Sequence, residues 1–375
     1  MKTILHIIKK EFQQFRRDPK MFGLILISPI IQLIFLGYAT NFDVKVVHTT
    51  IFDMDKSQES RLFLNNFKGS GYFSFDYYVN SYNQLQKNLE EGKSIVGIVI
   101  PHNFQKKIAK REPVKVQAIF DGSDGNTASI SAGYINSVVI NYSKNILLQT
   151  QMKAGNNFPS SLMKTETRVW YNPELKTRNF MVPGIVGLLI MIITLLLTSL
   201  AVVKEKEIGT MEQIIVTPIK PYQLILGKLI PFGILGLVSV VIVLTAMTLI
   251  FGIAIRGSIT FMFFTSFIYL LSTLGLGLFV STISKTQQQA MMLAIFVVML
   301  PMIYLSGFAF PIENMPKIIQ LTTYFIPMRY FTTIIRGIIL KGIGFAELWQ
   351  ETAIMLIMGI AILYISSLRF KKKLD

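Results

Sequence analysis

Six long stretches of the chain contain no charged residue, and this pattern constrains the fold more than any other feature. A helix needs about 20 apolar residues to cross the hydrocarbon core of a bilayer, and each stretch is near that length. The stretches are 22–40, 180–203, 229–255, 259–283, 290–310 and 352–368. Charged residues make up only 15% of the 375 residues, which is too few for a soluble chain of this size. The sequence therefore predicts an α-helical membrane protein with six transmembrane helices.

The segment before the first stretch, residues 1–20, is predicted to be an amphipathic helix at the membrane interface. Ile4, Ile8, Phe12 and Phe15 recur on one helical face, while the basic residues lie elsewhere. A basic flank that only directs topology would explain the charges equally well, but not the apolar face. A cleaved signal peptide has a shorter basic head and an apolar centre of about 7 to 15 residues. We therefore expect the first span to be retained.

Lysine and arginine cluster at four places that lie on one side of the membrane if the chain crosses six times. Basic residues near span ends are retained in the cytoplasm. The clusters precede the first stretch, fill residues 204–228, include Lys285 and follow the last stretch. We expect both termini in the cytoplasm, with the net charge of +16 attracted to the lipid bilayer rather than to nucleic acid. Four further basic residues fall on the opposite side: Lys317, Arg329, Arg336 and Lys341.

The six-span interpretation divides the chain into spans and connections. The predicted spans are 21–40, 179–203, 229–255, 259–283, 287–310 and 351–369. The predicted connections are 41–178 and 311–341 outside the cytoplasm, and 204–228 and the tail 370–375 inside it.

The insert 41–178 alternates runs of β-branched and aromatic residues with helical patterns. The runs are 45–53, 72–79, 94–100 and 114–121, with a return strand at 165–171. The helical segments are 57–68, 81–92, 103–111 and 126–152. This alternation is typical of an α/β sheet domain, which we expect to form an extracytoplasmic domain inserted after the first span. The apolar positions spaced by four in the last helix, such as Tyr134 and Val138, are expected to pack in its core.

Acidic residues at two predicted strand ends are compatible with a metal site or with turns. Asp53 and Asp55 form one group, and Asp121 and Asp124, with Asn126 beside them, form the other. The second group does not keep the ligand order of a calcium loop, whereas Asp is common at turns and helix N-caps. Three scattered histidines and the absence of cysteine argue against a zinc or iron site. We therefore expect turns, and no metal bound by this chain.

The chain contains no complete motif for catalysis or nucleotide binding. Residues 92–94 read Gly-Lys-Ser, but Lys87 stands where a phosphate-binding loop requires glycine. The six stretches also contain no ionisable residue, at which ion-driven carriers bind their coupling ion. An ion-driven transporter or channel is therefore disfavoured, and a membrane-anchored sensor with an external ligand-binding domain would not need six spans. We expect a non-catalytic transporter subunit driven by another polypeptide, which co-purification with a soluble ATPase would test.

Several short motifs follow one another along the chain in a recognisable order. Residues 172–174 read Asn-Pro-Glu, 179–184 read Asn-Phe-Met-Val-Pro-Gly, and 204–213 read Lys-Glu-Lys-Glu-Ile-Gly-Thr-Met-Glu-Gln. Val-Thr-Pro follows at 216–218, and Pro-Ile-Glu-Asn-Met-Pro stands at 311–316. Together these motifs resemble the permeases of type-2 ABC exporters, in the subgroup with a large external domain after the first span. The resemblance covers essentially the whole chain, and 204–213 is its most specific part.

The resemblance implies one half of an exporter in the bacterial inner membrane. The half would pair with a copy of itself or a paralogue, and with cytoplasmic ABC ATPase subunits that bind ATP and Mg²⁺. The connection 204–228 would form a coupling helix seated on the ATPase, with its glutamates facing basic partners. Local pairing of these acids with Lys204 and Lys206 is the alternative. The predicted ATPase-coupling residues are Glu205, Glu207, Gly209, Thr210 and Glu212.

The resemblance also implies export of amphipathic or apolar substrates, such as drug-like molecules or lipids, along a pathway between the two halves. The predicted pathway residues are Asn179, Thr194, Thr198, Met299 and Pro301. A periplasmic adaptor and an outer-membrane channel are further candidate partners. Residues 311–341 would dip back toward the membrane as two short helices, which keeps Arg329 and Arg336 out of lipid. An extra span at 325–340 would place both arginines in lipid and is rejected.

Overall fold

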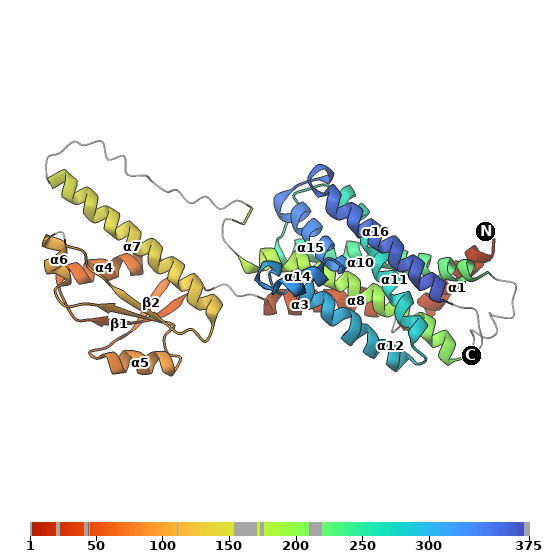
Figure 1. Cartoon of the computed structure of the whole chain (residues 1–375), viewed down its shortest axis with the longest axis horizontal. Coiled ribbons are helices and arrows are strands. Elements are labelled where there is room, and N and C mark those ends of the chain that lie inside the picture. The colour runs from red at the N-terminus through yellow and green to blue at the C-terminus, as the bar shows by residue number, and fades with distance from the viewer. Residues whose placement is uncertain are drawn as a thin grey trace. The chain divides into compact units, whose positions relative to one another are not determined.

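The computed structural model divides the chain into two compact units (Figure 1). The helical unit combines Met1–Asn41 with Arg168–Asp375, and the α/β unit is Phe42–Thr167. The structure describes residues 2–19, 23–40, 44, 46–110, 112–153, 171–172, 176–209 and 220–370. Each unit has its own cluster of buried apolar side chains, so each is described by itself.

The α/β unit contains a four-stranded sheet in the order β2-β1-β3-β4. β1 pairs in parallel with β2 and β3, and β4 pairs antiparallel with β3. The strands are β1 (Val47–Asp53), β2 (Phe73–Tyr78), β3 (Val96–Ile100) and β4 (Gln117–Phe120). All four predicted runs form strands, each shorter than predicted. Most of the predicted return strand at 165–171 lies outside the described residues.

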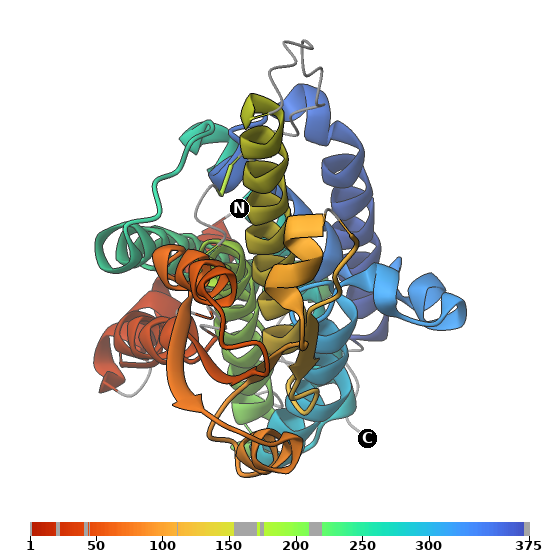
Figure 2. The same cartoon turned by 90° about the vertical axis from the view of Figure 1, so that its left-hand side faces the viewer.

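Helices cover both faces of this sheet (Figures 1 and 2). They are α4 (Gln58–Gly69), α5 (Tyr82–Glu90), α6 (Phe104–Lys110) and α7 (Gly125–Lys153). Ser57 and Ser81 cap α4 and α5 by accepting hydrogen bonds from backbone N–H groups of their first turns. Val138 and Tyr142 of α7 are buried in the core, where the Tyr142 ring meets Phe63 edge-on at 5.0 Å. The predicted role of this helix face in core packing is confirmed.

The helical unit contains five helices that are long and apolar enough to cross a membrane. This count refers to the described residues alone. The five are Thr177–Glu207, Tyr222–Phe251, Ile259–Ile283, Gln287–Leu305 and Phe345–Arg369. The first predicted span is described only as a shorter apolar helix, Ile25–Ala39. Its start is the π-helical turn η1 (Gly23–Ile27), which continues into α3 (Ser28–Ala39).

Several predicted boundaries shift because charged residues continue the helices. The long helices are α8 (Thr177–Glu207), α10 (Pro221–Phe251), α11 (Ile259–Ile283) and α16 (Phe345–Arg369). The fifth long segment joins α12 (Gln287–Leu293), the π-helical η2 (Ala294–Met299) and α13 (Leu300–Leu305). The shorter elements are α1 (Lys2–Arg17), η3 (Ile312–Asn314), α14 (Lys317–Thr323), α15 (Pro327–Arg336) and η4 (Gly337–Lys341). α16 starts earlier than predicted because Glu347 accepts a hydrogen bond from the Gly344 N–H at 2.9 Å and caps it.

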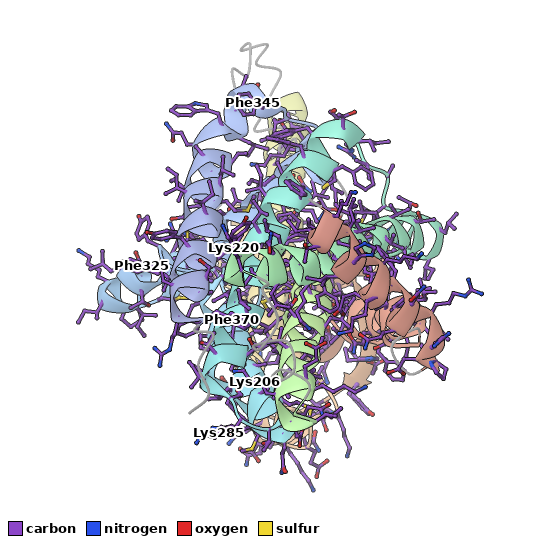
Figure 3. All side chains as sticks on the ribbon, turned by 90° about the vertical axis from the view of Figure 1, so that its right-hand side faces the viewer. Lys206, Lys220, Lys285, Phe325, Phe345 and Phe370 are labelled. Carbon is purple, nitrogen blue, oxygen red and sulfur yellow. The ribbon has the colours of Figure 1, made fainter. Side chains whose placement is uncertain are left out.

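Specific contacts show in which direction the long helices run. α11 and α16 are parallel, since Phe261 and Phe345 meet near their starts and Ser366 donates to the Gly275 carbonyl near their ends. α8 is parallel to α11, because the Thr194 hydroxyl donates to Thr273 at 2.8 Å and Lys206, later in α8, donates to the Ser281 carbonyl, later in α11. α10 runs antiparallel to them, because Lys228 near its start pairs with Glu205 at the end of α8, and Gly236 further along packs against Thr194. The C-terminal end of α8, the start of α10 and the turn before α12 therefore meet at one end of the unit, where Figure 3 labels Lys206 and Lys285.

Candidate functional site

The predicted coupling run begins as the last turn of α8. The helix ends at Glu207, and the Ile208 and Gly209 N–H groups donate to the Lys204 and Lys206 carbonyls. Gly209 has a φ of +81°, a left-handed conformation that glycine adopts without the steric cost of a Cβ. Glycine therefore suits the position that follows the end of α8. Two other predicted coupling residues, Thr210 and Glu212, lie outside the described residues.

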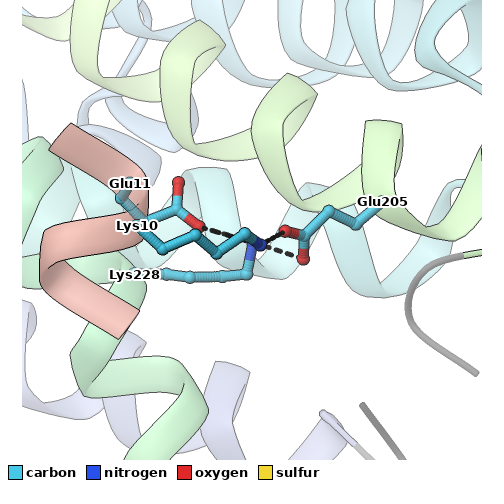
Figure 4. A network of polar contacts seen from close by, with 4 residues as sticks. All are labelled: Lys10, Glu11, Glu205 and Lys228. Atoms are coloured by element: carbon cyan, nitrogen blue, oxygen red, sulfur yellow. Dashed lines mark hydrogen bonds and ion pairs between the residues drawn. The ribbon is translucent and has the colours of Figure 1, made fainter. Parts of the chain in front are cut away.

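Glu205 lies inside the helical unit, between α8, α1 and α10 (Figure 4). Its Oε1 lies 2.5 Å from Lys10 Nζ of α1, and its Oε2 lies 2.6 Å from Lys228 Nζ of α10. Lys228 also lies 3.4 Å from Glu11 Oε1. We call Lys10, Glu11, Glu205 and Lys228 the four-residue network. It joins residues that are 195 positions apart in the chain.

Burial makes this network sensitive to the loss of Glu11, Glu205 or Lys228. The side chains of Lys228, Glu11 and Glu205 are 3%, 7% and 11% exposed, whereas Lys10 is 43% exposed. Removing one partner of a buried ion pair costs about 3–5 kcal/mol, because the remaining charge loses its compensation. Two cations and two anions keep the network neutral. The network therefore fixes α1 against the two long helices at this end of the unit.

Glu207 and Lys206 connect the same turn of α8 to other elements. Glu207 is exposed and accepts hydrogen bonds from the Gln287 side chain at 2.7 Å and from its backbone N–H at 3.3 Å. Lys206 donates to the Ser281 carbonyl near the end of α11. Glu205 and Glu207 thus contact α1, α10 and α12. The role of the glutamates in ATPase coupling stays a prediction.

The structure places the predicted pathway residues in three different environments. Thr194 and Thr198 are fully buried, and Thr194 bonds to Thr273 of α11. Asn179 lies in the first turn of α8, where its amide donates to the Asn172 side chain at 2.9 Å. Met299 ends the π-helical η2, and Pro301 lies in the first turn of α13. A π-helical turn next to a proline is a frequent feature of functional sites.

Arg336 of α15 is half-buried and binds three backbone carbonyls. Its guanidinium donates to Phe180 at 3.2 Å, Gly307 at 3.0 Å and Phe308 at 3.4 Å, and stacks 3.6 Å from the Phe180 ring centre. Arg329 donates to Thr323 and lies 3.9 Å from the Tyr324 ring centre. Arg336 therefore joins α15, the start of α8 and the turn after α13.

The acidic groups of the α/β unit hold turns and helix starts. Asp55 accepts hydrogen bonds from the Phe104 and Gln105 N–H groups at 3.1 and 3.0 Å, and so caps α6. Burial of the Asp55 carboxyl opposes ionisation, but hydrogen bonds from Ser57 and these N–H groups outweigh it and lower its pKa. Asp124 accepts from the Thr127 N–H in the first turn of α7. Within the described residues, no group of three or more His, Asp or Glu side chains is arranged to hold a metal ion.

Sequence reasoning missed three members of the network. It treats Lys10 only as a basic flank, and Lys228 only as part of a cytoplasmic connection. Glu11 carries a usable signal, because it follows Ile8 by three positions and precedes Phe15 by four, and so lies on the apolar face of α1. A carboxylate on such a face requires a cationic partner on the surface against which the helix packs.

Comparisons with known proteins agree with the motif resemblance. A family described as "ABC-2 family transporter protein" matches residues 19–368. The probable multidrug ABC transporter permease YbhR of Escherichia coli K12 is 32% identical over 345 residues, covering 92% of each chain. YbhS of the same organism is 32% identical over 367 residues, covering 98% of this chain and 96% of YbhS.

A more distant match extends the comparison to a longer transporter. ABC transporter G family member 20 of Dictyostelium discoideum is 23% identical over 378 residues, which covers 99% of this chain and 51% of that protein. The family match spans most of the chain, and the long apolar helices agree with it. The chain therefore belongs to the ABC-2 family, as a multi-pass membrane permease subunit of an ABC exporter.

Proposed function

We propose that this permease is one half of an ATP-driven exporter that moves amphipathic or apolar molecules outward across the bacterial inner membrane. YbhR and YbhS, which are named as probable multidrug ABC transporter permeases, support drug-like molecules as the substrate class, and lipids are the second candidate. The second half would be a copy of this chain or a paralogue. ATP and Mg²⁺ would bind to separate ABC ATPase subunits, and an adaptor with an outer-membrane channel would complete the route in a two-membrane envelope.

The proposed topology has six spans, with η1 and α3 as the first crossing and both termini in the cytoplasm. The parallel arrangement of α11 and α16 supports it, because only α12–η2–α13 needs to cross between them. On this topology α14 and α15 stay at the outer side, as the re-entrant helices of residues 311–341. The lysines at the ends of α8 and α11 then face the cytoplasm, as expected for retained basic residues.

A chain without cysteine allows a direct test of this topology. Lys285→Cys should react with a membrane-impermeant maleimide only after the cells are opened. Ile318→Cys, at a side chain that is 80% exposed on α14, should react in spheroplasts with intact inner membranes. Labelling of both variants in intact spheroplasts would contradict the proposed orientation.

The coupling proposal is carried by one observation: the last turn of α8 contacts α1, α10, α11 and α12 through consecutive charged residues. An ATPase pressing on the segment that begins at Gly209 would move the end of α8. The network would transmit this movement to α1 and α10, and Glu207 would transmit it to α12. Glu205 then acts as a positioning residue within the permease, while the exposed Glu207 is available to a basic partner surface.

The proposed substrate pathway lies between α8 and α12–η2–α13 of the two halves. Phe296, Val297 and Tyr304 on η2 and α13 are 61%, 61% and 50% exposed, so this segment offers an apolar surface to a partner half. Met299 and Pro301 mark the point where its helix geometry changes. Asn179 would lie at the outer end of the pathway. Thr194 and Thr198 would contribute through the packing of α8 on α11.

Charge reversal at Glu207 tests the coupling proposal. In the reconstituted permease–ATPase complex, Glu207→Lys should abolish substrate-stimulated ATP hydrolysis and leave membrane insertion intact. Glu112→Lys reverses an exposed charge on the α/β unit and is the matched control, with stimulation expected to remain at the wild-type level. Wild-type stimulation in Glu207→Lys would refute the coupling role.

A further inference from the structure

A pocket of about 440 Å³ opens beside the four-residue network, between α1, α8 and α10. Its volume falls within the range of about 300–1,000 Å³ that is usual for small-molecule sites. Amphipathic α1 forms one wall, and the two long helices form the other. Sequence reasoning assigned no ligand to this region.

The two ends of the pocket differ in chemistry. Arg17, Asp18 and Lys204 are among the charged residues of its lining, and Arg17 and Lys204 stand in the last turns of α1 and α8. Ala201, Phe232 and Leu235 are among the apolar lining residues, and Phe232 and Leu235 stand more than two turns inside α10. From Lys228 to Leu235 the axis of α10 advances about 10 Å, at about 1.5 Å per residue. The pocket therefore extends from the charged layer at the helix ends into the apolar part of the unit. A ligand that fills it must be amphipathic.

The charges at the polar end favour an anionic group. Glu205 and Glu11 are compensated by Lys10 and Lys228, so they do not repel an anion strongly. Lys204 lies 3.7 Å from Asp18, a long contact between partly exposed groups that contributes little. Arg17 is exposed and forms no ion pair with any described residue. Arg17 and Lys204 are thus available to a phosphate.

We propose that this pocket binds one anionic phospholipid, with its phosphate at Arg17 and Lys204 and an acyl chain along Ala201, Phe232 and Leu235. A free anion would leave the apolar end unfilled, and an uncharged apolar molecule would leave the basic groups unused. The assignment to the inner leaflet, where anionic lipids are enriched, rests on the orientation proposed above. A bound lipid contacts α1, α8 and α10 together, and so stabilises the docking of α1.

Native mass spectrometry of the full chain in mild detergent tests the site independently of that orientation. Wild-type protein titrated with phosphatidylglycerol should retain one tightly bound lipid, and phosphatidylcholine should bind at least tenfold more weakly. The double variant Arg17→Gln/Lys204→Gln should lose at least tenfold in phosphatidylglycerol affinity. Lys9→Gln/Arg16→Gln removes the same charge from exposed positions on α1 outside the pocket and should retain wild-type affinity.

Two further measurements make the test decisive. Ala201→Phe fills the apolar end and should also weaken phosphatidylglycerol binding, while inorganic phosphate at the same concentration should not raise the melting temperature of the wild type. Equal affinity of the wild type and Arg17→Gln/Lys204→Gln would overturn the proposal. An equal loss in both double variants would show general surface attraction and overturn it too, as would stabilisation by inorganic phosphate alone, which would show a free-anion site.

Discussion

Replacing Glu205 with glutamine removes the charge that joins α1 to both long helices while keeping nearly the same shape. Lys228, which is 3% exposed, would keep only Glu11 at 3.4 Å as an anionic partner. Lys10 would lose its 2.5 Å contact and turn to water, since it is 43% exposed. The variant should therefore weaken the docking of α1 without unfolding the long helices.

The size of this effect follows from the burial of the network. Loss of one partner of a buried pair costs about 3–5 kcal/mol, and the remaining Glu11 and the solvated Lys10 reduce this to about 2–3 kcal/mol. At about 1.36 kcal/mol per factor of ten, the local opening of α1 becomes about 30- to 150-fold more frequent. Adding Lys228→Met removes the buried cation that has lost its closest anion, and it leaves Glu11 with Lys10 at 3.8 Å. The double variant should therefore recover part of the loss.

Hydrogen exchange of the full chain measures this opening directly. In Glu205→Gln, the amides of α1 should exchange faster by the stated factor, while those in the centre of α11 should be unchanged. In the double variant, the amides of α1 should exchange more slowly than in Glu205→Gln alone. Unchanged α1 exchange in the single variant, or a double variant that exchanges faster still, would refute the argument that buried charge compensation holds α1 in place.

Three further substitutions, the first with a matched control, probe other parts of the structure. Gly277→Ala should lower the melting temperature, because the added Cβ would lie 2.8 Å from the Leu195 carbonyl oxygen. Gly233→Ala is the control. The atom nearest to its added Cβ would be 3.6 Å away, so this variant should be neutral or stabilising. Arg336→Met should destabilise the purified chain by about 3 kcal/mol or more, because it leaves three carbonyls without their donor. Asp55→Ala should cost about 1 kcal/mol of local α6 stability, measured by hydrogen exchange. The pKa of Asp55 in the folded protein is lowered from 3.8, so the carboxylate stabilises α6 above that pH, and this stabilisation is lost as the pH falls below it. The Asp55→Ala variant should therefore lack this acid-dependent loss of α6 stability.

Each of these variants has an outcome that contradicts the structure. Equal melting temperatures for Gly277→Ala and Gly233→Ala would mean that α8 and α11 do not approach as closely as described. If Arg336→Met were as stable as the wild type, the three carbonyls would have other hydrogen-bond donors. Acid-dependent opening of α6 that persists in Asp55→Ala would assign the titration to another carboxyl group.

The long helices were predictable because a run of about 20 apolar residues without a charge matches the thickness of a bilayer and is rare in soluble folds. The ends of these helices were harder to predict. Lys and Glu are good helix formers, so α8 continues through Glu207 beyond the apolar stretch that defined it. The first apolar stretch, 22–40, differs from α8, because its described helix is shorter than the stretch itself. This helix begins with a π-helical turn, and Pro29 stands in the first turn of α3.

The network could not be derived from the connection alone, because it depends on how α1 packs against α8 and α10. A run of alternating Lys and Glu is compatible both with solvated local pairs and with contacts to distant helices. Glu11 on the apolar face of α1 indicates that a cation lies opposite, but the sequence offers many lysines. The packing of Ile7 against Gly227 brings α1 and α10 close enough to select Lys228.

The repeat of the α-helix nevertheless places the two described glutamates of this run on different faces of α8. Two residues advance an α-helix by about 200°, so Glu205 and Glu207 lie on opposite sides of α8. Once α8 is known to continue through both, they cannot face the same surface. One must point toward the helices of its own subunit and the other away from them. The burial of Glu205 and the exposure of Glu207 decide which is which, and this makes Glu207 the residue at which an ATPase contact should first be sought.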